Sequence, residues 1–187
     1  MTITIEQMYE MQSELDTRII KEKGLEGKDL LPNTFLALRV ELGELANEWR
    51  GFKHWSNDQL PRNYCVHCQL SSLLHVCKNP LLEEYIDCLH FSLSIGLQLG
   101  FNIYQNKYIH DHNVQAYKSS HGITTQFNEV YKNICDIEEN ESDLEIYEDL
   151  LILLLSLGEM LGFTWDQIAA AYTEKNKINH ERQANGY

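Results

Sequence analysis

Helix start and stop signals recur along the whole chain, and they constrain its fold more than any other feature of the sequence. A start is a Ser, Thr, Asp or Asn followed three residues later by Glu or Gln, or a Pro in the first helical turn. We expect helices to start at Thr4 with Gln7, at Asn33, at Asn79 with Pro80, at Ser142 with Glu145, and at Thr164 with Gln167. The matching stops are Gly24, Gly51, Gly100 and Gly162. No segment alternates apolar and polar residues over the length of a strand, so the sequence predicts an all-α helical bundle.

The stretches between these signals have the apolar spacing of helices. Strong helical patterns cover residues 35–50 and 81–99, and weaker ones cover 104–118 and 125–133. The chain has 187 residues, of which 43% are hydrophobic, and this is enough for one core. We therefore expect a single all-α catalytic domain over residues 1–187.

A weak internal repeat runs through two of the expected helices. Residues 82–101 resemble residues 144–163 at a constant offset of 62 positions. Matching positions include Tyr85 with Tyr147, Ser94 with Ser156, and Gly96 with Gly158. Glu84 is replaced by Ile146 in the second copy, so only the first keeps a paired carboxylate. Either the two copies are related, or two buried helices share a composition by chance.

The charge balance excludes two classes of partner. Lys and Arg number 15 against 28 Asp and Glu, which gives a formal net charge of −13. Proteins that bind nucleic acid polymers or membrane surfaces need cationic faces, so we expect neither partner. A divalent cation is the simplest positively charged partner for such a chain.

The sequence also predicts a cytoplasmic protein. Its N-terminus has no basic start followed by an apolar run, which is the pattern of a signal peptide. The longest apolar run, residues 150–157, is far below the roughly 20 residues that a bilayer span needs. Five cysteines, an odd number, are typical of reduced thiols in such a protein.

Two pairs of carboxylates stand in helices that are otherwise apolar. Glu41 and Glu44 lie three residues apart, on one face of an expected helix that is apolar nearly all round. Glu84 and Asp87 have the same spacing in the next strong helix. We expect all four to be buried, although an unpaired buried carboxylate costs several kcal/mol and four together repel one another.

A metal is the interpretation that best accounts for four such carboxylates. Mg²⁺ prefers oxygen ligands and often shares its remaining positions with substrate phosphates. Two carboxylate pairs from two helices could hold two ions side by side, an arrangement that suits phosphoryl displacement. The alternative is that the acids lie on solvated faces or in structural ion pairs.

The last expected helix carries the opposite charge. Lys175, Asn179 and Arg182 fall on a single stripe, at positions i, i+4 and i+7. Arg and Lys together with an amide donor suit a phosphate chain. A polar C-terminal helix can also be a simple solvated end. The stripe therefore indicates phosphate binding only in combination with an acidic metal site.

Three segments of the sequence resemble a known family. The segments ELGELANEWRGFKHWS, NPLLEEYIDCLHFSLSIGLQLGF and AYTEKNKINHERQANGY resemble the dimeric, all-α dUTPases of the all-α nucleoside triphosphate pyrophosphatase (MazG-like) superfamily. The hallmark of the family is an ExxE pair on one helix and an ExxD pair on another, here Glu41 with Glu44 and Glu84 with Asp87. The resemblance implies Mg²⁺-dependent hydrolysis of dUTP, and of dUDP as well, to dUMP by a homodimer.

The resemblance also implies roles for individual residues. All four acids would be ligands of two or more Mg²⁺ ions, and Glu44 would be the general base that activates the attacking water. The uracil contacts would be Gln12 and Asp16, and Trp55 would line the base pocket. The stripe Lys175, Asn179 and Arg182 would bind phosphates or sugar.

One segment departs from the compact relatives. Residues 58–78 are interpreted as a family-variable insertion between the two acidic pairs. They contain Cys65, Cys68, His75 and Cys77, which are ligand types for a structural Zn²⁺. Reduced cysteines without a metal are the alternative.

Three functional hypotheses therefore remain. The first is a dUTP pyrophosphohydrolase, and the second is a related enzyme that acts on dCTP or on a wider dNTP set. The third is a di-iron carboxylate bundle or a non-catalytic helical module. Di-iron bundles need two Glu-x-x-His motifs, whereas this chain offers only Asp87-x-x-His90 at that spacing.

Overall fold

The computed structural model describes residues 2–63, 79–105, 118–120 and 122–186. Within these residues there are six α-helices, one short 3₁₀ helix and no strand. The helices are α1 (Ile5–Lys23), α2 (Leu31–Trp49), α3 (Pro80–Leu99), η2 (Ile103–Gln105), α5 (Ile123–Glu139), α6 (Leu144–Met160) and α7 (Trp165–Ala184). The predicted all-α fold is confirmed.

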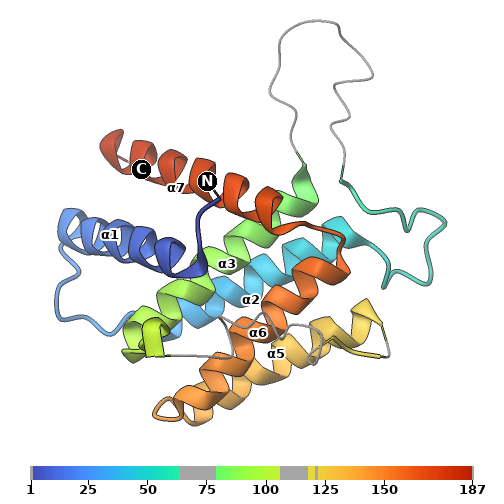
Figure 1. Cartoon of the computed structure of the whole chain (residues 1–187), viewed down its shortest axis with the longest axis horizontal. Coiled ribbons are helices and arrows are strands. Elements are labelled where there is room, and N and C mark those ends of the chain that lie inside the picture. Colours follow the sequence, from blue (N-terminus) through green and yellow to red (C-terminus); the bar gives the residue numbers. More distant parts are fainter. Residues whose placement is uncertain (1, 64–78, 106–117, 121, 187) are drawn as a thin grey trace, which may run out of the picture.

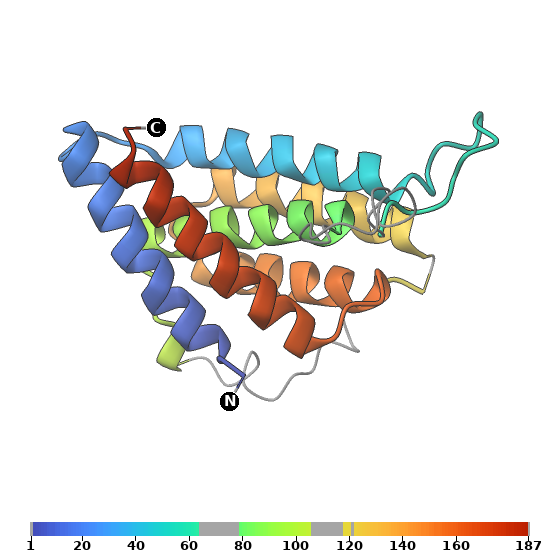
Figure 2. The ribbon, with the colours of Figure 1, turned by 90° about the horizontal axis from the view of Figure 1, so that it is seen from above.

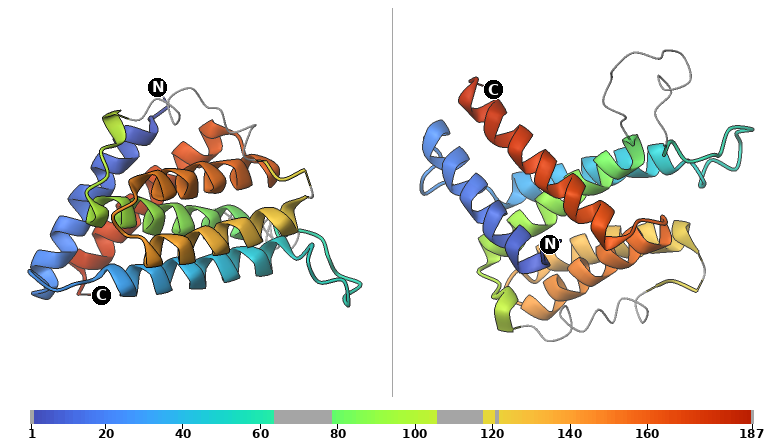
Figure 3. Two further views of the ribbon diagram at one scale, coloured as in Figure 1. Left: turned by 90° about the horizontal axis from the view of Figure 1, so that it is seen from below. Right: turned by 45° about the horizontal axis from the view of Figure 1, so that its top comes forward.

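Four of the helices form a bundle, and the other two lie across it (Figure 1). In the bundle α2 packs on α3, α3 on α6, α6 on α5, and α5 on α2, so the four helices close a ring. Their axes run roughly parallel in the view of Figure 3, left. Helices α1 and α7 lie side by side and run diagonally over the bundle (Figure 2), where both contact α3.

One apolar core draws on all six α-helices. On α2 it takes Phe35, Leu38, Leu42 and Leu45, each no more than 1% exposed. None of the described helices is long and apolar enough to cross a membrane.

Most of the predicted helix ends agree with the structure. Thr4 with Gln7 and Thr164 with Gln167 form complete capping boxes, in which each side chain bonds the backbone of the other residue. Asn79 Oδ1 accepts a hydrogen bond from the Leu82 N–H at 3.2 Å. Local sequence is sufficient for these caps because both partners lie within one helical turn.

Three predicted helix ends were wrong. Asn33 lies in the first turn of α2, which begins at Leu31, where the N–H donates to Asp29 Oδ1 at 3.1 Å. Asp143 rather than Ser142 caps α6, because its side chain accepts from the Glu145 N–H. Arg50 rather than Gly51 ends α2, in the left-handed conformation with φ 64°.

The two weaker helical patterns had different outcomes. The pattern over 125–133 belongs to a longer helix, α5, which extends to Glu139. For the pattern over 104–118, the structure describes the 3₁₀ helix Ile103–Gln105, and residues 106–117 lie outside the described part of the chain.

The internal repeat has a direct counterpart in how α3 packs against α6. The Tyr85 hydroxyl donates to the Leu154 carbonyl at 3.3 Å, and the Tyr147 hydroxyl donates to the Ser92 carbonyl at 3.2 Å. Donor and acceptor are exchanged between the two bonds under the same offset of 62 positions. The two helices therefore cross antiparallel with an approximate two-fold relation, in which the matched positions of the repeat make matching contacts.

Two glycines make these contacts possible. A Cβ atom on Gly96 would lie 2.2 Å from the Tyr147 hydroxyl oxygen, and one on Gly158 would lie 2.5 Å from that of Tyr85. Each tyrosine ring thus occupies the space that a side chain would need on the facing helix. The glycines are matched positions of the repeat, as the tyrosines are.

Candidate functional site

Three of the four predicted acids come together between α2 and α3. Glu41 of α2 and Glu84 and Asp87 of α3 each offer an oxygen, and these oxygens all lie within 4.8 Å of one another. The arrangement follows from local spacing and packing. A separation of three residues places Glu84 and Asp87 on one face of α3, and α2 packs along that helix.

The expectation that all four acids are buried was wrong. Glu41, Glu84 and Asp87 are half-buried, whereas Glu44 is exposed and outside the group of three. The reason is that the described chain covers only one face of α2. Its other face leaves Leu36 61% and Val40 49% exposed.

Burial and mutual repulsion make the acids of the group hard to ionise. Burial is the largest cause that raises the pKa of Glu84 to about 7, and the charges of Asp87, Glu41 and Glu44 add to it. The pKa of Glu41 is raised by the same kind of causes, burial first. The site therefore favours either protons or cations among its carboxylates.

A lysine from the last helix supplies one such cation. Lys175 Nζ of α7 lies 2.5 Å from Asp87 Oδ2, and both side chains are less than 20% exposed. The pKa of Asp87 is raised by burial, against which Lys175 and Arg182 act to lower it. The predicted cationic stripe thus faces the acids directly, because α7 packs on α3.

A cavity of about 300 Å³ adjoins the acids. Its walls come from α1, α2, α3 and α7. They include seven of the residues that the sequence singled out, namely Gln12, Asp16, Glu41, Asp87, Lys175, Asn179 and Arg182. The cavity therefore joins an acidic end, a cationic wall and a pair of polar side chains from α1.

The polar side chains from α1 are held in a hydrogen-bond network. Gln12 Nε2 donates to Asp16 Oδ1 at 2.7 Å, and Gln12 Oε1 lies 2.6 Å from His90 Nδ1 and 3.0 Å from the Tyr172 hydroxyl. The pKa of Asp16 is raised by burial and lowered by hydrogen bonds from Ser94 and Gln12. This end of the cavity is rigid and polar.

Sequence reasoning missed the inner members of this network. His90 is 5% exposed and Ser94 is 8% exposed, and both line the cavity from α3. Their signal is present in the sequence, since polar residues stand at i+3 and i+7 from Asp87 on a largely apolar helix. Tyr172 carried no such signal because tyrosines are common in helical cores.

Other predicted residues lie apart from this cavity. Trp55 is 67% exposed in the segment after α2, where its ring makes edge contacts with Phe52 and His54. Within the described residues it does not line the cavity. The predicted zinc ligands Cys65, Cys68, His75 and Cys77 lie outside the described residues.

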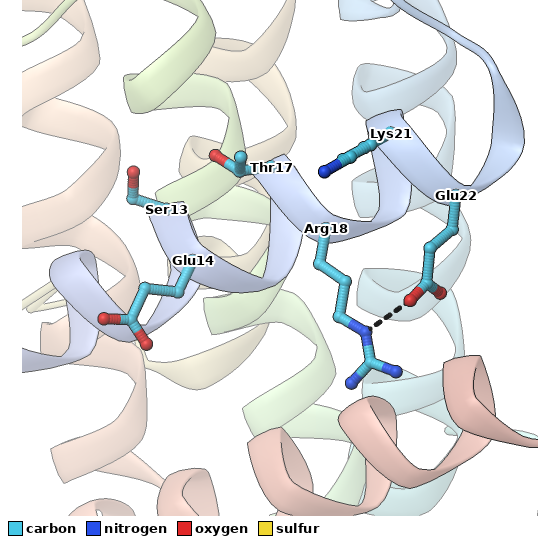
Figure 4. Close-up of a pocket in the computed structure, with 6 residues that line it drawn as sticks. All are labelled: Ser13, Glu14, Thr17, Arg18, Lys21 and Glu22. Carbon is cyan, nitrogen blue, oxygen red and sulfur yellow. Dashed lines mark hydrogen bonds and ion pairs between the residues drawn. The ribbon is translucent and has the colours of Figure 1, made fainter.

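A larger and more open hollow lies on the outer side of α1 (Figure 4). Its residues are all polar and come from this one helix: Ser13, Glu14, Thr17, Arg18, Lys21 and Glu22. Arg18 Nε pairs with Glu22 at 2.7 Å, and Arg18 also donates to the His180 carbonyl at 3.1 Å. This hollow holds none of the three clustered acids, so the candidate site is the cavity beside them.

Fold and site together define a class of protein. A helical bundle that sets acids from two helices beside a Lys–Asn–Arg stripe and a small polar cavity is an all-α nucleotide hydrolase. The particular family follows from comparison with known proteins. A family model described as dUTPase matches residues 4–187, and the chain belongs to this family. It is therefore an enzyme with dUTP diphosphatase activity. A comparison with curated proteins found no match.

Proposed function

We propose that the enzyme hydrolyses dUTP to dUMP and pyrophosphate, and dUDP to dUMP and phosphate, with Mg²⁺ held by its acid cluster. One observation carries the proposal. Oxygens of Glu41, Glu84 and Asp87, from two helices, lie within 4.8 Å of one another beside Lys175. A polyphosphate in the adjoining cavity would lie next to the acid cluster and next to Lys175.

The donor set suits Mg²⁺. It consists of carboxylate oxygens alone, which a hard cation prefers, and it contains no His or Cys ligand. Burial and mutual repulsion raise the pKa values of Glu41 and Glu84, and a divalent cation relieves both effects. When bound, Mg²⁺ supplies charge neutralisation at the phosphate groups, and two or more ions suit a displacement at phosphorus.

Glu44 is the residue that we propose as the general base. It lies one turn after Glu41 on the same helix, exposed to water, and it acts on both Glu41 and Glu84 electrostatically. It takes the proton of the attacking water, while Lys175, Asn179 and Arg182 hold the phosphates or sugar. These three line the cavity from α7.

The base is bound at the α1 end of the cavity. Gln12 and Asp16 line this end and present amide and carboxylate groups, the types that pair with a nucleobase edge. Trp55 is exposed and thus available to close over a base. The alternative substrates are dCTP or a wider dNTP set, since the Asp16 carboxylate can also accept from an amino group.

A homodimer is the proposed assembly. Leu36, Val40 and Glu44 lie four residues apart on one stripe of α2, and both apolar members are about half or more exposed. A second copy that covers this stripe removes apolar area from water. It also shelters Glu44, which the single chain leaves exposed.

The test is product release from dUTP, dUDP, dTTP and dCTP, with and without Mg²⁺. We expect pyrophosphate from dUTP and phosphate from dUDP, only with the metal, and much slower reactions of dTTP and dCTP. Equal rates for dCTP would favour the wider alternative, and turnover in the presence of a chelator would contradict the metal role.

A substitution tests the role of Glu44 as general base. Glu44→Gln keeps the shape of the side chain and removes its ability to accept a proton, so dUTP binding should persist while kcat collapses. Glu129→Gln, at an exposed position of α5, makes the same change of charge and serves as the control. An unchanged kcat in Glu44→Gln would remove Glu44 from this role.

A further inference from the structure

We propose that His90 and Tyr172 are positioning residues that hold the carboxamide of Gln12 in one orientation, so that Gln12 offers a ligand only hydrogen-bond donors. The consequence is selection of a base with a carbonyl group over one with an amino group at the same place. This inference rests on the proposed function, because it requires the base of the nucleotide to enter this cavity.

The orientation of the Gln12 carboxamide is set first by Asp16. An ionised carboxylate can only accept hydrogen bonds, so the group of Gln12 that lies 2.7 Å from Asp16 Oδ1 must be the amino group. Burial raises the pKa of Asp16, and the hydrogen bonds that its carboxylate accepts from Ser94 and Gln12 act against this rise. The carbonyl oxygen of Gln12 therefore points the other way, toward His90 and Tyr172.

His90 completes the arrangement. Its Nδ1 lies 2.6 Å from Gln12 Oε1, so the imidazole must carry its hydrogen on Nδ1 and donate it. Burial lowers the pKa of His90 to about 3, which keeps the ring neutral with this one hydrogen. The ring stacks on Tyr172 at 4.1 Å between centroids, with an interplanar angle of 14°, so it cannot turn freely.

Tyr172 adds a second, weaker restraint. Its hydroxyl lies 3.0 Å from Gln12 Oε1 and 3.1 Å from the Met8 carbonyl oxygen, and it has one hydrogen to share between these two acceptors. A rotated Gln12 carboxamide would set its carbonyl against the Asp16 carboxylate, and its amino group would force the His90 hydrogen from Nδ1 to Nε2, a buried atom without a partner among the described residues. The contact with Asp16 would be mismatched and the change at His90 would leave a buried N–H unpaired, and Gln12 is only 4% exposed, so solvent compensates little for either cost.

Gln12 therefore offers a ligand a hydrogen bond of fixed direction, with the protein as the donor. The Gln12 carbonyl is occupied by its two donors, whereas the amino group uses one hydrogen for Asp16 and keeps one for a ligand. Uracil has a carbonyl at C4 where cytosine has an amino group. An N–H donor with a fixed orientation can bond the carbonyl of uracil but repels the amino group of cytosine. A carboxamide that is free to rotate would pair with either group.

The test compares kcat and KM for dUTP and dCTP in four variants with Mg²⁺. His90→Phe keeps a stacked ring and removes the donor, and it should raise KM for dUTP by about tenfold with kcat little changed. The same variant should raise kcat/KM for dCTP, which a merely structural defect would not do. His90→Asn returns an N–H near the Nδ1 position and should bring the KM for dUTP back toward that of the parent enzyme.

The other two variants show how large a change in the dUTP to dCTP ratio is specific to the contacts of Gln12. Tyr172→Phe removes the shared hydroxyl and should shift the dUTP to dCTP ratio in the same direction by a smaller factor. Tyr9→Phe removes another buried hydroxyl, which donates to the Phe101 carbonyl at 2.8 Å and not to the Gln12 carboxamide. It should leave the ratio unchanged.

The outcomes separate the two proposals. A dUTP to dCTP ratio that is unchanged in both His90→Phe and Tyr172→Phe, with dUTP turnover intact, would overturn this inference and leave the proposed function standing. A parent enzyme that hydrolyses neither nucleotide would remove both. If His90→Phe does not fold, Tyr172→Phe and His90→Asn carry the same comparison.

Discussion

Neutralising one acid of the cluster should stabilise the metal-free fold. The perturbation is Glu84→Gln, which keeps the size of the side chain and removes its charge. Burial and the neighbouring carboxylates raise the pKa of Glu84 from 4.5 to about 7. A carboxyl group whose pKa is raised on folding destabilises the native state at every pH above the folded pKa. This destabilisation disappears as the pH falls from about 7 to about 4.5.

The magnitude follows from the difference between the two pKa values. The shift of 2.5 between 4.5 and about 7 corresponds to about 3 kcal/mol as an upper bound. Glu84 is only half-buried, so screening by water reduces the effect to about 1–2 kcal/mol. For a chain of this size we expect Glu84→Gln to raise Tm by about 2–8 °C at pH 8 in a chelator.

The assay is thermal unfolding at pH 8 and pH 5, with a chelator or with Mg²⁺. The gain from Glu84→Gln should shrink at pH 5, and the variant should gain less than the parent from Mg²⁺. Glu129→Gln controls for the change in net charge. If Glu84→Gln melts at or below the parent temperature at pH 8 without metal, the electrostatic account of the cluster is wrong.

The remaining predictions concern packing, binding and a helix start. Gly158→Ala places a Cβ 2.5 Å from the Tyr85 hydroxyl and should cost about 1–3 kcal/mol in urea unfolding; no loss would mean that the ring can move aside. Lys175→Met removes the cation beside Asp87 and should raise KM for dUTP by about tenfold in steady-state kinetics, whereas an unchanged KM would exclude a phosphate contact. Thr164→Ala breaks the capping box of α7 and should cost about 1 kcal/mol by thermal unfolding, and an equal Tm would show that the cap is dispensable.

The helices and the acid group were predictable because their determinants are local. The capping box of Thr4 with Gln7 lies within one turn, and so does the spacing of Glu84 and Asp87. Both depend on the period of the helix and little else. The start of α2 was missed because its N-cap residue, Leu30, has no capping side chain, and the cap of α6 was assigned to Ser142 because the neighbouring Asp143 is an equally suitable cap residue.

The exposure of Glu44 and the network around Gln12 depend on tertiary packing. Helix α2 is apolar nearly all round, so its sequence does not say which face the chain covers. The network joins Gln12, His90 and Tyr172 from α1, α3 and α7. No spacing in the sequence relates positions so far apart, and only the crossing of these helices brings them together.

The paired contacts of Tyr85 with Gly158 and Tyr147 with Gly96 fix the position of α3 on α6, and α3 carries two of the three acids. Sliding α3 along its axis by one helical turn would move Glu84 and Asp87 by about 5.4 Å, farther than the 4.8 Å that encloses the three oxygen donors. Both tyrosine rings oppose such sliding, one near each end of the helix. Residues outside the acid group thus help to hold the two carboxylates of α3 in place, and a substitution at either glycine could shift them without altering an acid.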